Sequence, residues 1–101
     1  MIHFGLATSN EIAEELASRL RKHRLEQNLQ QSELAARAGI SRKTLTTFES
    51  SGKVSFDVFL RIVAALGLSD SLSTLFERET KSIRDMELAE KQRQRASRKK
   101  T

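Results

Sequence analysis

The sequence predicts a small all-α protein, and three observations support that prediction. Apolar residues recur at helical spacing through most of the 101-residue chain. No stretch alternates with period two, and β-branched residues are scarce. Proline is absent, and the four glycines are spread along the chain, where they can stop helices. We therefore expect a five-helix domain over residues 8–77, followed by a charged extension over residues 78–101.

The first helix is expected to run from Thr8 or Ser9 to about Gln27. Thr8 and Glu11 have the spacing of a capping box, in which each side chain accepts a backbone N–H of the other. The apolar stripe of this helix consists of Ile12, Leu16, Leu20 and Leu25. Asn28, which tolerates the left-handed conformation, is expected to close the helix.

Two short helices joined by one tight turn are expected next, over residues 31–38 and 42–50. The first has Leu34, Ala35 and Ala38 on one face and Gly39 just past its end. Ser41 is a good N-cap for the second, which buries Leu45 and Phe48 and ends at Gly52. The residues left outside on the second helix contain no acid: Arg42, Lys43, Thr44, Thr46 and Thr47. A cationic helix face across a short turn from a supporting helix is the geometry that enters the major groove of DNA.

The fourth helix is expected over residues 56–66, with Ser55 as its cap and Gly67 as its stop. Its apolar residues lie on most sides, which predicts a helix buried in the centre of the bundle: Phe56, Phe59, Leu60, Ile62, Val63 and Leu66. A short fifth helix is expected over residues 70–76. Beyond it, residues 80–90 favour a marginal helix that needs a partner, and residues 91–101 are predicted to form a disordered basic tail.

The net charge of +5 is distributed unevenly along the chain. Residues 1–18 carry −3, residues 19–61 carry +5, residues 62–90 carry −3 and residues 91–101 carry +6. A domain polarised in this way can meet phosphates on one side and a protein on the other. The alternative for residues 19–61 is that their positive charge has no function and reflects the ordinary variation of charge between short blocks. For the tail, contact with nucleic acid or an acidic partner and a merely solvated end remain open.

The stretch QSELAARAGISRKTLTTFESSG resembles the helix-turn-helix of the Xre/Cro/phage-repressor family, and the resemblance covers about residues 16–76. It implies DNA base contacts from Arg42, Lys43, Thr44 and Thr47. It implies phosphate contacts from Gln31, Ser41, Ser51 and Lys53. Arg24 and Glu49 match a pair that ties the first helix to the end of the third in this family. Gln30 departs from the family pattern, which commonly has serine or threonine there, and Asn28 stands where glycine is frequent.

The resemblance also implies a homodimer on a palindromic double-stranded DNA operator, because one recognition helix reads few base pairs. The residues expected at the dimer interface are Leu72, Leu75, Phe76 and Ile83. Alternatively, the first three of these complete the core of the monomer. The function implied is that of a sequence-specific, DNA-binding transcriptional repressor.

The LGLSDSLSTLF run and the charged tail are also similar to HipB-like antitoxins of toxin-antitoxin systems, which pair with HipA-type kinases and repress their own operon. Two alternatives stay open: an antitoxin that acts mainly by binding such a kinase, and a free-standing phage-type regulator without a toxin. RNA binding is a third and less supported alternative, because the sequence shows no aromatic residues that could form a platform for base stacking.

Catalysis, a cofactor and a metal site are not expected. His3 and His23 are isolated, the chain has no cysteine, and the prominent serines stand at cap positions. The start MIHFGLA lacks the basic residues and long apolar run of a signal peptide, and no segment approaches a membrane span. We therefore expect a cytoplasmic protein, and the family resemblance implies a nucleoid-associated protein of a bacterium or phage.

Overall fold

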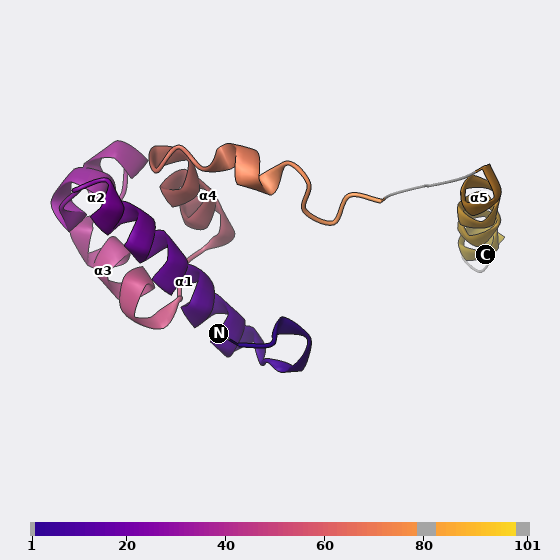
Figure 1. Ribbon diagram of the computed structural model, residues 1–101, viewed down its shortest axis with the longest axis horizontal. Coiled ribbons are helices and arrows are strands. Elements are labelled where there is room, and N and C mark those ends of the chain that lie inside the picture. Colours follow the sequence, from indigo (N-terminus) through magenta and orange to yellow (C-terminus); the bar gives the residue numbers. More distant parts are fainter. Residues whose placement is uncertain (1, 79–82, 99–101) are drawn as a thin grey trace.

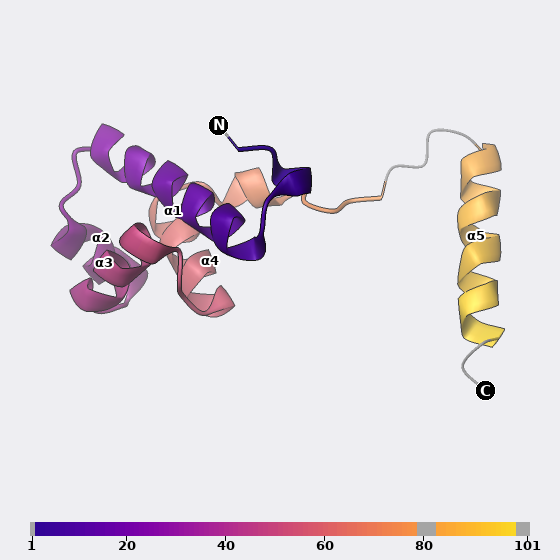
Figure 2. The same ribbon diagram turned by 90° about the horizontal axis from the view of Figure 1, so that it is seen from below.

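The computed structural model describes residues 2–78 and 83–98, in which five α-helices and two 3-10 turns occur and no strand (Figure 1). The α-helices are α1 (Ser9–Glu26), α2 (Gln31–Ala38), α3 (Arg42–Ser51), α4 (Phe56–Ala65) and α5 (Ile83–Arg98), and the 3-10 turns are η1 (Phe4–Leu6) and η2 (Ser69–Leu72). Helices α1 to α4 pack together in both views, whereas α5 lies apart from them (Figures 1 and 2). The all-α prediction is confirmed.

Short polar residues determine where the helices begin and end, as the sequence indicates. Thr8 donates its backbone N–H to the Glu11 carboxylate at 2.9 Å, and the Thr8 hydroxyl accepts the Glu11 N–H at 3.1 Å. The hydrogen bond from the Thr8 backbone lowers the pKa of Glu11, and the nearby Thr8 side chain lowers it further. Asn28 adopts φ +57° just beyond α1. The cap of α4 is Ser55, whose hydroxyl accepts the Val58 N–H.

The core lies where α1, α2, α3 and α4 meet. Its buried apolar residues come from all four helices and from the α1–α2 loop: Ala17, Leu29, Leu34, Ala35, Ala38, Leu45, Phe48, Ile62, Val63 and Leu66. The rings of Phe48 and Phe59 pack edge to face, with centroids 6.1 Å apart. The fully buried side chains of Leu45 and Phe48 fix the rotation of α3, so that Arg42, Lys43, Thr46 and Thr47 face solvent.

Three residues that were expected to pack in the core are exposed instead. The prediction that α4 is buried on most sides is wrong for Leu60 and for Phe56, whose exposed fraction is 74%. Phe56 lies in the first turn of α4, whereas the buried residues Ile62 and Val63 lie in its second half. On α1, Leu25 is exposed, and the charged residue Arg24 takes the buried place at this end of the helix.

The predicted fifth helix over residues 70–76 is wrong. The segment forms the single 3-10 turn η2 and then further turns, because Ser73 donates its hydroxyl to the Asp70 carbonyl and so favours a turn over helix elongation. Phe76 takes φ +57° and is 96% exposed, and Leu75 is 53% exposed. Leu75 and Phe76 therefore do not complete the monomer core, whereas Leu72 is half-buried.

The C-terminal extension also differs from expectation. Residues 91–98, expected to be disordered, continue helix α5, while residues 80–82 and 99–101 lie outside the described residues. The reason is composition, since residues 91–98 contain lysine, glutamine, arginine, alanine and one serine, mostly strong helix formers. Glu90 and Arg93 also form an ion pair one turn apart. The side chains of Met86 and Leu88 on this helix are exposed.

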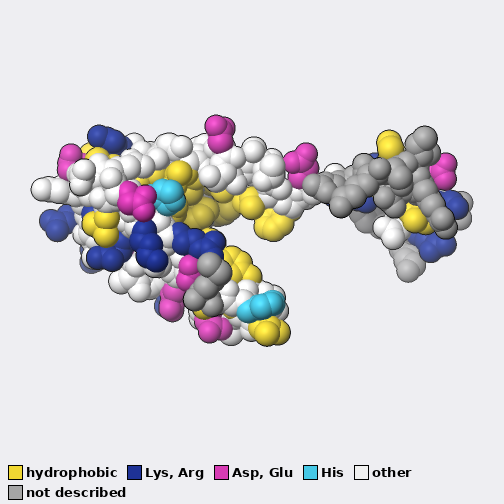
Figure 3. All heavy atoms as spheres, in the orientation of Figure 1, with side chains coloured by type: hydrophobic (Ala, Val, Ile, Leu, Met, Phe, Trp, Pro, Cys, Tyr) yellow, Lys and Arg dark blue, Asp and Glu magenta, His cyan; other side chains and the backbone are white. Residues whose placement is uncertain are grey.

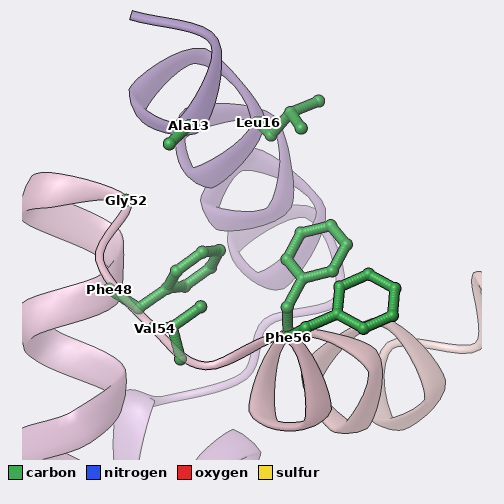
Figure 4. Close-up of a pocket in the computed structure, with 7 residues that line it drawn as sticks. Ala13, Leu16, Phe48, Gly52, Val54 and Phe56 are labelled. Carbon is green, nitrogen blue, oxygen red and sulfur yellow. The ribbon is translucent and has the colours of Figure 1, made fainter. Parts of the chain in front are cut away.

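Gly52 brings the loop after α3 against α1. With φ +75°, a Cβ at Gly52 would lie 2.5 Å from the Ala13 carbonyl carbon and 2.8 Å from the Glu14 nitrogen, so only glycine fits. Beside this contact lies an apolar pocket of about 310 Å³, lined by Ala13, Leu16, Phe48, Gly52, Val54, Phe56 and Phe59. Figure 4 shows Phe48 and Val54 facing α1 across this pocket. The close approach fixes where the chain leaves α3.

Candidate nucleic-acid interface

A tight turn of three residues joins α2 to α3. Gly39 adopts φ +69°, and the N–H of Ile40 donates to the Ala35 carbonyl at 3.0 Å, which closes the end of α2. Ser41 then caps α3 by accepting the Thr44 N–H at 3.0 Å. Since both helices bury their apolar faces in the same core, this turn fixes the angle at which α3 is presented to solvent.

A buried ion pair fixes the other end of α3. Arg24 of α1 donates two hydrogen bonds to the Glu49 carboxylate, at 2.7 and 3.0 Å, and a third to the Leu29 carbonyl at 2.8 Å. The side chains of Arg24 and Glu49 are only 8% and 5% exposed. The two residues that the family resemblance pairs are thus in direct contact, and α3 is anchored to α1 at its C-terminal half.

The solvent-facing side of α3 is cationic and polar. Arg42, Lys43, Thr46 and Thr47 are exposed, and neither Arg42 nor Lys43 pairs with a carboxylate among the residues described. Thr44 is half-buried, with its hydroxyl 2.8 Å from that of Ser41. Of the four predicted base-contacting residues, Arg42, Lys43 and Thr47 therefore project freely, whereas the hydroxyl of Thr44 is already engaged in the cap.

The predicted phosphate-contacting residues surround α3. Gln31 begins α2, where its side chain reaches α3, and Ser41 stands at the start of α3. Ser51 donates its hydroxyl to the Thr47 carbonyl at 2.6 Å and accepts the backbone N–H of Lys53 at 3.1 Å. The proton of Ser51 is therefore occupied, whereas Lys53 is exposed.

Sequence reasoning missed the role of Thr46. Its hydroxyl donates to Gln31 Oε1 at 3.0 Å, while Gln31 Nε2 donates to Glu49 Oε1 at 3.0 Å. Thr46 and Glu49 are three residues apart and therefore share one face of α3. That spacing, combined with the predicted Arg24–Glu49 ion pair, could have indicated that Thr46 belongs to the same group of contacts.

Cationic side chains gather around this surface. Figure 3 shows many of the lysines and arginines of the visible face over the end of the domain formed by α2, α3 and the C-terminal half of α1. The acids of α1 are concentrated in its N-terminal half, at Glu11, Glu14 and Glu15. The negative charge of residues 1–18 and the positive charge that begins at Arg19 are thus separated along α1.

The residues expected at a dimer interface are only partly described. Leu72 is half-buried in η2, Leu75 and Phe76 are exposed, and Ile83 begins α5 without a described side chain. Within residues 2–78 and 83–98, no three His, Asp or Glu side chains lie close enough to hold a metal ion. None of the helices in the described segments is long and apolar enough to cross a membrane.

A comparison with models of protein families bears on this interface. The sequence model of the Helix-turn-helix family matches residues 20–72, just over half of the chain. The matched range begins within α1 and includes α2, the turn, α3 and α4, so it contains the whole candidate interface. No curated protein matches the chain's sequence.

Proposed function

Because the chain belongs to the helix-turn-helix family of Xre/Cro type, whose members are DNA-binding regulators, we propose that it is a repressor that reads its operator with α3. The observation that carries the proposal is the acid-free, exposed face of α3, which the Arg24–Glu49 ion pair and the α2–α3 turn hold rigidly. A single helix that holds its exposed hydrogen-bond donors in a fixed orientation suits the major groove of DNA.

The proposed base contacts follow from side-chain chemistry. Arg42 and Lys43, at the start of α3, present donors that match the O6 and N7 acceptors of guanine. Thr47, one turn further along, can place its methyl group against that of thymine. Thr44 contributes less, since its hydroxyl is hydrogen-bonded to Ser41.

The proposed phosphate contacts come from the residues around α3. Lys53 supplies a free ammonium group in the loop after α3, and Gln31 stands at the start of α2, where the helix dipole favours an anion. Ser41 and Ser51 approach the same surface, but the hydroxyl of Ser51 must rotate away from the Thr47 carbonyl before it can donate. Lys53 and Gln31 therefore carry most of this part of the proposal.

The test is a double substitution on α3. Arg42→Ala with Lys43→Ala should abolish discrimination between the operator, selected by the wild-type protein from random duplexes, and a random sequence. Each good base contact contributes about 1–3 kcal/mol of discrimination. Lys22→Ala with Arg61→Ala removes the same charge from exposed positions on α1 and α4, and this control should keep the operator preference. Full operator preference in the α3 double variant would show that another surface reads the DNA.

We further propose that the protein acts as a homodimer on a palindromic operator. The exposed apolar side chains of Leu75 and Phe76 support this, since a 96%-exposed phenylalanine held at φ +57° has no evident role in the monomer. Leu72 and Ile83 flank this segment. Light scattering should give a dimer on operator DNA, whereas a monomer both free and bound would contradict the proposal.

A toxin-antitoxin role is a second candidate. The exposed Met86 and Leu88 on α5, in the proposed extension over residues 78–101, suit a protein partner, and a HipA-type kinase is the partner implied by the HipB-like resemblance. In that case the protein represses its own operon from the bacterial cytoplasm, associated with the nucleoid. Co-purification with the product of an adjacent kinase-like gene would favour this candidate. The absence of such a gene would favour a free-standing regulator.

A further inference from the structure

A chain of hydrogen bonds connects the outer face of α3 to the buried arginine of α1. Thr46 donates to Gln31 Oε1, Gln31 Nε2 donates to Glu49, and Arg24 donates to both oxygens of the same carboxylate. The distances along this chain run from 2.7 to 3.0 Å. Thr46 is exposed at one end, and Arg24 is buried at the other.

The chemistry of these groups fixes the direction of every bond. A carboxylate only accepts, so the amino group of the Gln31 amide must face Glu49. The amide oxygen then faces Thr46, and the Thr46 hydroxyl must donate to it. The reversed amide would place its oxygen against the Glu49 carboxylate. The buried charge of Glu49 therefore sets the orientation of a side chain at the start of α2.

The direction of these bonds determines which hydrogen-bond donors each side chain has left for DNA. A primary amide has two N–H donors, and only one of those on Gln31 is used by Glu49. The proton of Thr46 is given to Gln31, so in this arrangement its hydroxyl has no donor left for a phosphate. The second N–H of Gln31 is thus a donor that this hydrogen-bond chain leaves free.

We propose that Thr46 is a positioning residue for DNA binding. By holding Gln31 Oε1, it keeps the amide turned so that the second N–H of Gln31 is presented to a DNA phosphate at the start of α2. The inference rests on the proposed function, because it assumes that the surface of α3 and the start of α2 meets DNA. It assigns Thr46 an effect on affinity for every sequence rather than the reading of a particular base.

The experiment compares Thr46→Val, which keeps the shape but cannot donate, with Thr46→Ser, which keeps the hydroxyl. Thr46→Val should weaken binding to operator and random duplex alike by about five-fold, the effect of one net hydrogen bond. Thr46→Ser should bind as the wild type does. In a Gln31→Ala background, Thr46→Val should have no further effect, because its action passes through Gln31.

Two outcomes would overturn the proposal. An equal loss from Thr46→Val with and without Gln31 would show that Thr46 does not act through the amide. A loss confined to the operator would show that Thr46 contacts a base. Thermal unfolding of each variant, followed by circular dichroism, separates these effects from a loss of folded protein.

A spectrum of the free protein tests the hydrogen bond without DNA. Thr46→Val should shift the side-chain N–H signals of Gln31 in the ¹H–¹⁵N spectrum, while backbone signals of the α4 core residues Ile62 and Val63 keep their positions. Unchanged Gln31 signals would overturn the inference even if the protein binds DNA specifically. Conversely, a shift of these signals in a protein that selects no operator would contradict the proposed function and leave the hydrogen-bond chain standing.

Discussion

Removal of the Glu49 carboxylate should be among the most damaging single changes to this fold. Glu49 accepts two hydrogen bonds from Arg24 and one from Gln31, and the ion pair is almost completely shielded from water. In Glu49→Ala the Arg24 guanidinium stays buried with only the Leu29 carbonyl as a partner. Breaking a buried pair in this way costs about 3–5 kcal/mol. Small domains have only about 5–15 kcal/mol of stability, so the variant should be marginally folded.

The assay is urea unfolding followed by far-ultraviolet circular dichroism, because the chain has neither tryptophan nor tyrosine for fluorescence. The matched control is Asp57→Ala, which breaks an ion pair with Arg61 at 3.0 Å whose two side chains are 74% and 54% exposed. This exposed pair should contribute less than about 1 kcal/mol. If Glu49→Ala lowers the free energy of unfolding no more than Asp57→Ala does, the anchoring role of the buried pair is refuted.

Three further outcomes are expected. Gly52→Ala should destabilise the protein more than Gly67→Ala in thermal unfolding, since both glycines have left-handed φ angles of +75° and +74° but only Gly52 lies against backbone of α1. Equal losses would contradict this. Glu11→Gln should remove stability that is present above the ordinary glutamate pKa and lost as the pH falls through the lowered pKa of Glu11. Wild-type and variant unfolding curves should therefore converge in acid, and a constant difference would exclude the capping contribution. Deletion of residues 91–101 should weaken binding to operator and random duplex alike and flatten the salt dependence, because fewer counterions are released. An unchanged salt slope would show that this segment does not contact phosphates.

The sequence predicts the first four helices well because their ends depend on local chemistry. The capping box at Thr8, the serine caps and the left-handed Gly39 and Gly52 act through neighbours within four residues, so their positions can be read from the chain. The helix predicted over residues 70–76 is wrong because the same apolar spacing also suits a turn. The Ser73 side chain there forms a hydrogen bond with the Asp70 carbonyl, a backbone group that a helix would otherwise use.

Burial was harder to predict than helix position. Phe56 is a large aromatic residue of the kind that usually forms a core, yet at the start of α4 it lines the apolar pocket beside α1 and stays 74% exposed. Arg24 shows the opposite case, since a charge becomes buried only because Glu49, 25 residues away, meets it. The bond from Thr46 to Gln31 is equally non-local, because it depends on the angle between α2 and α3 rather than on either helix alone.

The exposed face of α3 could be predicted almost completely, because fixing Leu45 and Phe48 inward determines which residues face outward. What periodicity does not show is which of those side chains are already engaged. The sequence gives no sign that the hydroxyls of Thr44 and Ser51 have hydrogen-bond partners, but in the fold both have one. The contact of these residues with DNA stays a prediction.

The most direct test of the account is selection of binding sites by the full chain from a library of random DNA duplexes. We predict enrichment of one two-fold symmetric sequence, with half-sites about one helical turn apart, because paired α3 helices would enter successive major grooves on one side of the duplex. The Arg42→Ala, Lys43→Ala double variant should enrich nothing from the same library. A wild-type pool that stays as random as the input would contradict the central claim that α3 reads a DNA sequence.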